Sequence, residues 1–550
     1  MHRVAAIRAR LAGLSDSGAV AVCATLLFVL SAWPLVLVEV PPLQDLPNHV
    51  ATSHIIAHPD IYPEYVFNGF CKSNSLLALW LYLLGGLGLW PAARAFTALV
   101  LAMAAVALPT FQLRFAGRRS LYAGATFAWP LVHGFFVSMG MLNFSFAWAL
   151  SLLLLVVIDR QREHPSWRRG LLVTLLAGLV WYAHPFPLMV VVGLVGLHVL
   201  QAGPGLRTRA RLGLVMLLPL LPLAGLALLS AQQHLVKAPT RTQTGPWAVY
   251  YPPWESVVHL WLDASGALTR WGSVTLLPAL LLVYFAWRQR RVPRRFFSSL
   301  AMAGLALAYF AVPATLSNWC YLNSRFVPFL WAGAIVRLPE RLPRAVSAGL
   351  MAAALFFSVV LGVDYVRLDH DRAAFAAGTA AVPMRATLLP LLFKHRQTSD
   401  FTASLTHAWS DYVVARNTSA PLAFAVERSY PITYRDFPPP SLIPPALDQL
   451  AEKWGTPAQV CQRLRPGPRQ ADEDCKEQWR RRWAIFWREA EPRFSHLLTW
   501  AMPPEARPMI PPSYRAIFIA GALEIYARSP IPPGLPDLRP ALMPDAGHVL

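Results

Sequence analysis

Charge is scarce in this chain. Only 14% of its 550 residues are charged, whereas 55% are hydrophobic and the mean hydropathy is +0.41. Soluble proteins carry about a quarter charged residues, so the composition excludes an ordinary soluble enzyme. Several apolar runs reach about 18 residues or more, which is long enough to cross a hydrocarbon layer of about 30 Å. The sequence therefore predicts a polytopic α-helical membrane protein.

Acidic residues are scarcer than basic ones, with 29 Asp and Glu against 49 Lys and Arg. Residues 1–364 hold 27 basic and 11 acidic residues, whereas residues 365–550 hold 22 and 18. Most of the excess lies in short arginine-rich loops between apolar runs. This is the positive-inside pattern of membrane proteins and not a nucleic-acid-binding surface, so we expect no nucleic-acid partner.

Short chemical motifs are also lacking. The five cysteines contain no CxxC pair, which excludes the usual zinc and redox motifs. The chain has no glycine-rich phosphate loop and no internal repeat. Cys461 and Cys475 leave two alternatives open: they form a disulfide if the region is exported, or they are two free thiols.

The apolar runs predict about 11 crossings, within a range of roughly 10–12. They cover residues 19–40, 92–113, 121–137, 142–158, 170–200, 212–229, 271–287, 296–316, 326–336 and 345–363. The run 170–200 holds two short crossings, because Pro185 breaks a helix after His184. Ser75–Leu89 either crosses as well or lies in the interface. If all arginine-rich loops are cytoplasmic, the second reading is favoured, with a cytoplasmic N-terminus and an exterior C-terminus.

Two domains follow from this pattern. Residues 1–364 form the membrane domain, with exterior loops at 41–74 and 230–270, and residues 365–550 form a smaller mixed α/β domain on the exterior side. Within the second domain we expect helices at 372–393, 405–415 and 473–491. Strands are expected at 422–426 and 516–519.

Asp45 and His49 follow the first apolar run and lie four residues apart, so they share a helical face. A carboxylate at the membrane surface suits general-base catalysis on a membrane-held substrate. We therefore predict that Asp45 and His49 are catalytic. The alternative is that Asp45 only caps a helix. We interpret Asp60 and Glu64, in the same loop, as acidic residues that are exposed to solvent.

Basic and polar residues on the same predicted face suit substrate binding. Arg325 precedes a span, where its planar guanidinium can bind a lipid phosphate or can simply extend toward the interface. Lys237 and Arg241 are alternative phosphate ligands in an exterior loop. His184 and Asn143 either contact the substrate or cap helices.

The order of these features resembles the GT-C superfamily of polytopic glycosyltransferases, over residues 1–364. The likeness is to bacterial dolichyl-phosphate-mannose-type and aminoarabinose-type transferases, and it rests on Asp45, the segment Ser75–Leu89 and the junction Ala92-Ala93-Arg94. The stretches Asp45-Leu46-Pro47-Asn48-His49 and Leu142-Asn143-Phe144 are also similar to poorly characterised membrane proteins of Gram-negative bacteria.

The resemblance implies inverting transfer of a sugar from a polyprenyl-phosphate donor to a lipid or glycan acceptor. It implies the outer face of the bacterial inner membrane, with Asp45 as the base or as the holder of a metal. Gln44-Asp45 replaces the acidic pair that is common in this family, so no metal ligand is predicted and a divalent cation is left open. The alternatives are a lipid or solute transporter or flippase, and a non-enzymatic envelope assembly factor.

Overall fold

The structure is a computed structural model. It describes residues 13–203, 205–223, 225–226, 228, 248–265, 268, 270–290, 295–316, 319–395, 402–422, 425, 430–464 and 471–529. The chain divides into two compact units. The membrane unit comprises Met1–Ala376, His395–Ala415 and Leu422–Ile443, and the second unit comprises Ala377–Lys394, Arg416–Pro421 and Pro444–Leu550.

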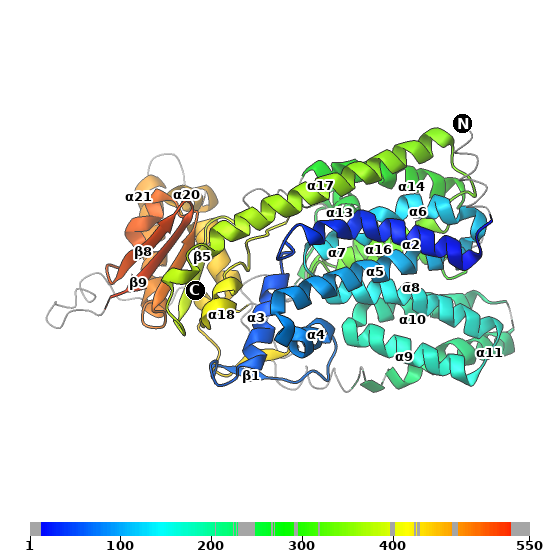
Figure 1. Ribbon diagram of the computed structural model, residues 1–550, viewed down its shortest axis with the longest axis horizontal. Helices are drawn as coiled ribbons and strands as arrows, with labels where there is room; N and C mark the ends of the chain where they lie inside the picture. The colour runs from blue at the N-terminus through cyan, green and yellow to red at the C-terminus, as the bar shows by residue number, and fades with distance from the viewer. Residues whose placement is uncertain are drawn as a thin grey trace. The chain divides into compact units, whose positions relative to one another are not determined.

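The membrane unit is built almost entirely from helices (Figure 1). They are α2 (Asp16–Ala32), α3 (Leu46–Ala57), α4 (Leu76–Leu84), α5 (Leu89–Ala116), α6 (Arg118–Val132), α7 (Phe135–Ser138), α8 (Leu142–Glu163), α9 (Trp167–Ala183), α10 (Pro185–Gln201), α11 (Leu206–Leu217), α13 (Pro253–Ser265), α14 (Leu276–Arg288), α15 (Ser299–Ala311), α16 (Val327–Ile335), α17 (Arg344–Ala376) and α18 (Ser410–Arg416). Short 3₁₀ turns connect several of them, including η1 (Trp33–Val36) and η5 (Asn323–Phe326).

Five helical segments of the described chain are long and apolar enough to cross a membrane. They are Asp16–Val36, Leu89–Ala116, Leu142–Glu163, Trp271–Arg288 and Arg344–Ala381. Every other predicted span also contains a described helix, but these helices are shorter. The nine residues of α4 extend roughly 14 Å, about half of the hydrocarbon thickness. The number of crossings therefore stays a prediction.

Helix α8 lies at the centre of the membrane unit and packs against α5, α9 and α10 (Figure 1). Its sequence is apolar on all sides between Leu142 and Ile158, as expected of a helix that is surrounded by other helices. Accordingly, 89% of its most apolar stretch is buried, against 44% for the first span. The core of the unit is thus built around α8.

The predicted break at His184 is confirmed. His184 has an extended backbone between α9 and α10, and Pro185 occupies the first turn of α10. Proline is favourable there because that position has no helical acceptor for a backbone N–H. The Nδ1 atom of His184 accepts the backbone N–H of Phe186 at 3.2 Å and so caps α10.

Two small sheets complete the membrane unit. Strand β1 (Tyr65–Phe67) pairs antiparallel with β6 (Ile432–Tyr434), which joins the first long loop to a segment far along the chain. Strands β2 (Ala248–Val249), β3 (Thr315–Leu316) and β4 (Trp319–Cys320) form a three-stranded antiparallel sheet. The first loop is therefore completed by residues that follow the last long helix.

The second unit contains a four-stranded sheet in the order β5-β7-β9-β8. Its strands are β5 (Leu388–Leu392), β7 (His496–Trp500), β8 (Tyr514–Ala520) and β9 (Leu523–Arg528), and only the β5–β7 pair is parallel. Its helices include α19 (Pro444–Asp448), α20 (Pro457–Leu464) and α21 (Ala471–Ala490). A disulfide between Cys461 and Cys475 joins α20 to α21, which decides between the two alternatives for these cysteines.

Two helix predictions after residue 364 need correction. The expected helix 372–393 is wrong, because α17 ends at Ala376 and Leu388–Leu392 is strand β5. Pro390 is tolerated there because β5 is an edge strand of the sheet. The expected helix 405–415 begins only at Ser410.

Two other predictions for this region are confirmed. The helix predicted at 473–491 is α21, and the strand at 516–519 lies within β8. The strand predicted at 422–426 lies partly outside the described residues. The predicted boundary at 364/365 falls inside α17, since this helix continues past its apolar part, and the segments 395–415 and 422–443 belong to the membrane unit.

Candidate functional site

Asp45 lies immediately before α3, where the chain leaves the first span. Its backbone N–H donates to the carbonyl of Met139 at 3.1 Å. Gly140 has a φ of +76°, and a Cβ atom there would lie 2.7 Å from the Asp45 nitrogen, so this close approach requires glycine. Although Asp45 occupies the N-cap position of α3, its side chain makes no capping hydrogen bond. Capping therefore does not account for its carboxyl group.

The Asp45 carboxyl group lies in a largely buried environment, with its side chain 14% exposed. Burial raises the pKa of Asp45 to about 7, and a hydrogen bond with the Gln44 side chain acts in the opposite direction. Gln44 is itself held by the backbone N–H of Ala403, which donates to its Oε1 at 2.9 Å. A carboxyl group with a pKa near 7 can take up a proton at physiological pH.

One histidine lies against the Asp45 carboxyl group, and a second follows it in α3. His407 Nε2 lies 3.8 Å from Asp45 Oδ1, and His49 follows Asp45 by one turn of α3. Burial lowers the pKa of His49 to about 4. Burial, together with His395 and His49 nearby, lowers the pKa of His407 to about 3. Both imidazoles are thus neutral at pH 7 and do not provide Asp45 with a cationic partner.

Arg325 and His184 form a second group of predicted site residues, and the structure brings them together. Arg325 lies in η5, directly before α16, and is buried with 7% of its surface exposed. Its Nη1 lies 2.7 Å from His184 Nε2, and its Nη2 donates to the carbonyl of Cys320 at 3.4 Å. No carboxylate of the described residues forms an ion pair with Arg325.

Hydrogen-bond donors outnumber acceptors around Arg325. A neutral imidazole has one acceptor nitrogen, yet Nδ1 of His184 faces the Phe186 N–H and Nε2 faces Arg325. One of these two donors is therefore left without an acceptor from the imidazole. Arg325 Nε is also buried without a partner in the described structure. An anion with several acceptor oxygens would satisfy these donors.

Aromatic rings surround the Arg325 guanidinium. Its carbon lies 5.6 Å from the Phe144 ring centre, 6.0 Å from that of Phe186 and 5.9 Å from that of Trp319. Lys72 is a buried basic residue that sequence reasoning missed, and its Nζ donates to the carbonyl of Tyr430 at 3.3 Å. Burial lowers the pKa of Lys72 to about 8.

Asn143 is engaged in tying helices together. Its Oδ1 accepts the Leu77 N–H at 2.9 Å, and its Nδ2 donates to the carbonyl and to Oδ1 of Asn74, at 2.9 and 3.0 Å. These bonds fix the start of α4 against the start of α8. In this arrangement Asn143 positions the backbone around the site.

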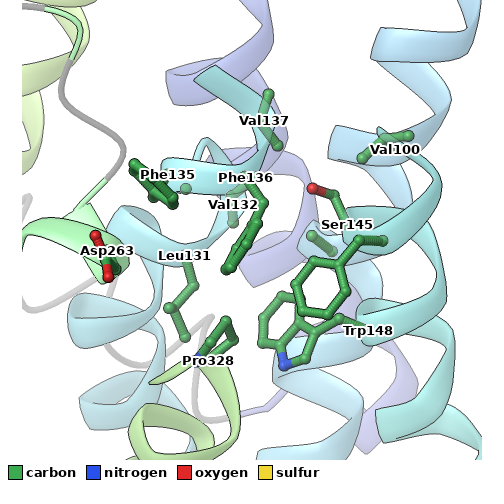
Figure 2. A pocket seen from close by; sticks show the side chains of 13 residues that line it. Val100, Leu131, Val132, Phe135, Phe136, Val137, Ser145, Trp148, Asp263 and Pro328 are labelled. Carbon is green, nitrogen blue, oxygen red and sulfur yellow. The ribbon is translucent and has the colours of Figure 1, made fainter. Parts of the chain in front are cut away.

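The turn between α7 and α8 connects the two groups. Gly140 packs against Asp45, and Phe144, four residues later, lies beneath Arg325. Phe144 also lines a small apolar cavity, together with residues of α5, α6, α7, α13 and α16 (Figure 2). Asp263, Ser145 and Trp148 are the residues with polar groups that line it. Asp263 is bonded to Ser324 Oγ and to His259 Nδ1, which lies 3.0 Å from it.

The remaining predictions concern metals and the loop lysine and arginine. Lys237 and Arg241 lie outside the described residues. Within the part of the chain that the structure describes, no group of three or more His, Cys, Asp or Glu side chains is arranged to hold a metal ion. Of the residues around Asp45, His407 was missed, because it lies far along the chain and in no recognisable local motif. Gln44 was noted only as the replacement of an acidic residue, and its bond to Ala403 could not be foreseen.

The long apolar helices and the buried polar groups at their ends define an α-helical membrane protein. No protein-family model matches the chain, and a search of curated proteins finds no similar one.

Proposed function

We propose that this protein is a membrane glycosyltransferase of the GT-C type. It moves a sugar from a polyprenyl-phosphate donor to a lipid or glycan acceptor at the outer face of the bacterial inner membrane. The observation that carries the proposal is the surplus of buried hydrogen-bond donors at Arg325 and His184, which suits a phosphate group. Asp45 supplies the base that the transfer requires.

The chemistry divides between the two groups of residues. The Asp45 carboxylate takes the proton of the acceptor hydroxyl while the acceptor oxygen attacks the anomeric carbon of the sugar. The bond between that carbon and the phosphate oxygen breaks, and the polyprenyl phosphate leaves with the bonding electron pair. Arg325 stabilises the negative charge that develops on the leaving phosphate. The proton remains on Asp45 until it is released to solvent.

Exposed aromatic side chains support a position at a membrane surface. Tyr250, Trp254 and Trp319 belong to the segments around β2, α13 and β4, and they are 58%, 67% and 46% exposed. Tyr and Trp are enriched at the depth of the lipid head groups. Since Trp319 also contacts Arg325, the guanidinium is proposed to lie where the phosphate of a membrane lipid would be.

The disulfide supports an exported second unit. Disulfides persist in oxidising compartments such as the periplasm and are rare in the cytosol. Cys461–Cys475 lies in the second unit. An exterior C-terminal unit agrees with the charge pattern of the loops in residues 1–364, which independently predicts the same orientation.

Replacing the base tests the proposed reaction. In Asp45→Asn, we expect the rate of sugar transfer to fall by about 100- to 10,000-fold, because general-base catalysis is lost. Transfer would be measured with full-length protein in lipid nanodiscs, as release of polyprenyl phosphate from a radiolabelled polyprenyl-phosphate sugar in the presence of an envelope-glycan extract. Asp60→Asn, at an exposed position in the same loop, is the matched control and should retain the wild-type rate.

Stability separates chemistry from folding in this test. Asp45 titrates near pH 7 in the folded state but near its ordinary pKa of 3.8 in the unfolded chain. Ionising it therefore destabilises the fold as the pH rises toward 7, and this effect vanishes below about pH 3.8. At pH 8 Asp45→Asn should unfold at the wild-type temperature or above it. A folded Asp45→Asn variant with full transfer activity would contradict the proposal.

A further inference from the structure

Helix α3 carries a polar stripe along one face. Asp45, Asn48, His49, Thr52 and Ser53 follow the spacing i, i+3, i+4, i+7 and i+8, which places them on the same side of a helix. A buried helix normally presents apolar residues at these positions. The stripe begins at Asp45 and runs away from it along α3.

Three residues of the stripe hold buried polar atoms without partners. Asn48, Thr52 and Ser53 are 0%, 2% and 1% exposed. In the described structure no hydrogen-bond partner reaches Asn48 Nδ2, Asn48 Oδ1, Thr52 Oγ1 or Ser53 Oγ. The stripe therefore offers at least two kinds of group, an amide and hydroxyls, that can both donate and accept.

Some hydroxyls in other helices of the membrane unit are satisfied internally, although Ser410 Oγ in α18 also has no partner in the described structure. Thr97 Oγ1 donates to the carbonyl of Ala93 at 2.9 Å, and Ser145 Oγ donates to the carbonyl of Met141 at 3.2 Å. This bond to the carbonyl four residues earlier is the usual solution for Ser and Thr within a helix. Thr52 and Ser53 do not adopt it. Because unpaired buried polar groups destabilise a fold, a ligand is the natural reason to keep them.

We propose that the stripe Asn48, Thr52 and Ser53 binds the sugar of the lipid-linked donor, an inference that rests on the proposed function. The groups are uncharged and both donate and accept, as sugar hydroxyls do, so they match a sugar and do not suit an alkyl chain. The sugar then lies beside Asp45. Arg325, which is cationic, remains the group for the phosphate.

A binding cycle tests the stripe without relying on activity. The affinities of polyprenyl phosphate and of polyprenyl phosphates that carry mannose, glucose or aminoarabinose are measured on full-length protein in nanodiscs. In Asn48→Leu and in Thr52→Val, we expect the affinity for at least one sugar-bearing lipid to fall about three- to tenfold. Affinity for polyprenyl phosphate without a sugar should change less than about twofold. A larger loss for the sugar-bearing lipid than for polyprenyl phosphate shows that the substituted residue interacts with the sugar.

The control is Thr97→Val, which makes the same change at a buried threonine whose hydroxyl is already satisfied. It should leave the affinity for every probe unchanged. Thr52→Val removes an unpaired hydroxyl without changing the side-chain shape, so its unfolding temperature should equal or exceed that of the wild type. If Thr52→Val instead lowers the unfolding temperature and leaves sugar affinity unchanged, the hydroxyl has a structural role and the inference is overturned.

Failure of this inference differs from failure of the proposed function. If the sugar increases the affinity of the wild-type protein and the stripe variants remove that increase, the stripe stands even when no transfer is observed. If transfer occurs and depends on Asp45 but the stripe variants bind sugar-bearing lipids normally, the inference fails and the proposed function stands. Equal affinity of the wild-type protein for all four lipids would also overturn it.

Discussion

Buried carboxyl groups lie near the two ends of α8 in opposite electrostatic settings: Asp159 belongs to α8, and Asp45 packs against the turn before it. Near its C-terminal end, Asp159 is fully buried and bonded to three arginines. They are Arg114, with Nη2 at 2.5 Å from Oδ2, Arg162, with Nε at 3.1 Å from Oδ1, and Arg295. At the other end of this helix, whose 22 residues extend roughly 33 Å, Asp45 lies against one neutral histidine and is followed by another in α3.

The difference separates structural charges from charges that are available to a ligand. The arginines around Asp159 come from α5, from α8 and from the segment before α15, so they fasten three parts of the unit together. Arg325 has no such carboxylate among the described residues. We therefore interpret the Asp159 cluster as structural. The residues around Asp45 and Arg325 form the candidate functional site.

The largest effect is expected from Asp159→Asn. Removing the carboxylate leaves Arg114, Arg162 and Arg295 with Glu163 as their remaining shared partner. Because Asp159 is buried while these arginines are 23–42% exposed, we expect a cost of about 1–3 kcal/mol, between the costs of breaking an exposed and a buried ion pair. The unfolding free energy would be measured by denaturant titration in detergent. Glu163→Gln, at a position 29% exposed in the same cluster, should change it by less than about 1 kcal/mol. An Asp159→Asn variant as stable as the wild type would show that Asp159 has no structural role, which would contradict the proposed difference between the two ends of α8.

A smaller effect is expected in the pH dependence of transfer. If Asp45 is the base, kcat/KM should fall about tenfold per pH unit below pH 7, since the protonated carboxyl group cannot accept a proton. In Gln44→Met, this fall in kcat/KM should begin at a higher pH, because the Gln44 hydrogen bond holds the pKa of Asp45 down. Rates measured between about pH 5.5 and 9 would test both expectations. If kcat/KM of Gln44→Met falls over the same pH range as that of the wild type, Asp45 is not the titrating group.

Hydropathy and proline predicted the helices of the membrane unit well, because both act locally. Each apolar run contains a helix, and the break at His184-Pro185 lies where proline requires it. Local patterns failed at Leu388–Leu392. This apolar run is a strand because it pairs with His496–Trp500, more than a hundred residues away, and nothing near it in the sequence signals that partner.

The candidate site could be anticipated from the sequence only in part, for the same reason. Asp45, His184 and Arg325 could each be singled out, because a carboxylate, a helix-breaking turn and an arginine beside spans are local signals. Their partners could not. His407 reaches Asp45 only because the segment after α17 returns to the first loop, and the surplus of donors at Arg325 emerges only from its contact with His184. That Asn48, Thr52 and Ser53 have polar atoms without partners in the described structure also could not be predicted, since it depends on the elements packed around α3.

The affinity of the purified protein for polyprenyl phosphate tests the central claim most directly. With Arg325→Gln, we predict a loss of about 10- to 100-fold, because charge-assisted hydrogen bonds to the phosphate disappear. Arg325→Lys should fall between, since it keeps the charge without the planar fork. Arg119→Gln, at a side chain 81% exposed, should change affinity less than about twofold. Equal affinities of Arg325→Gln, Arg119→Gln and the wild type would contradict the account.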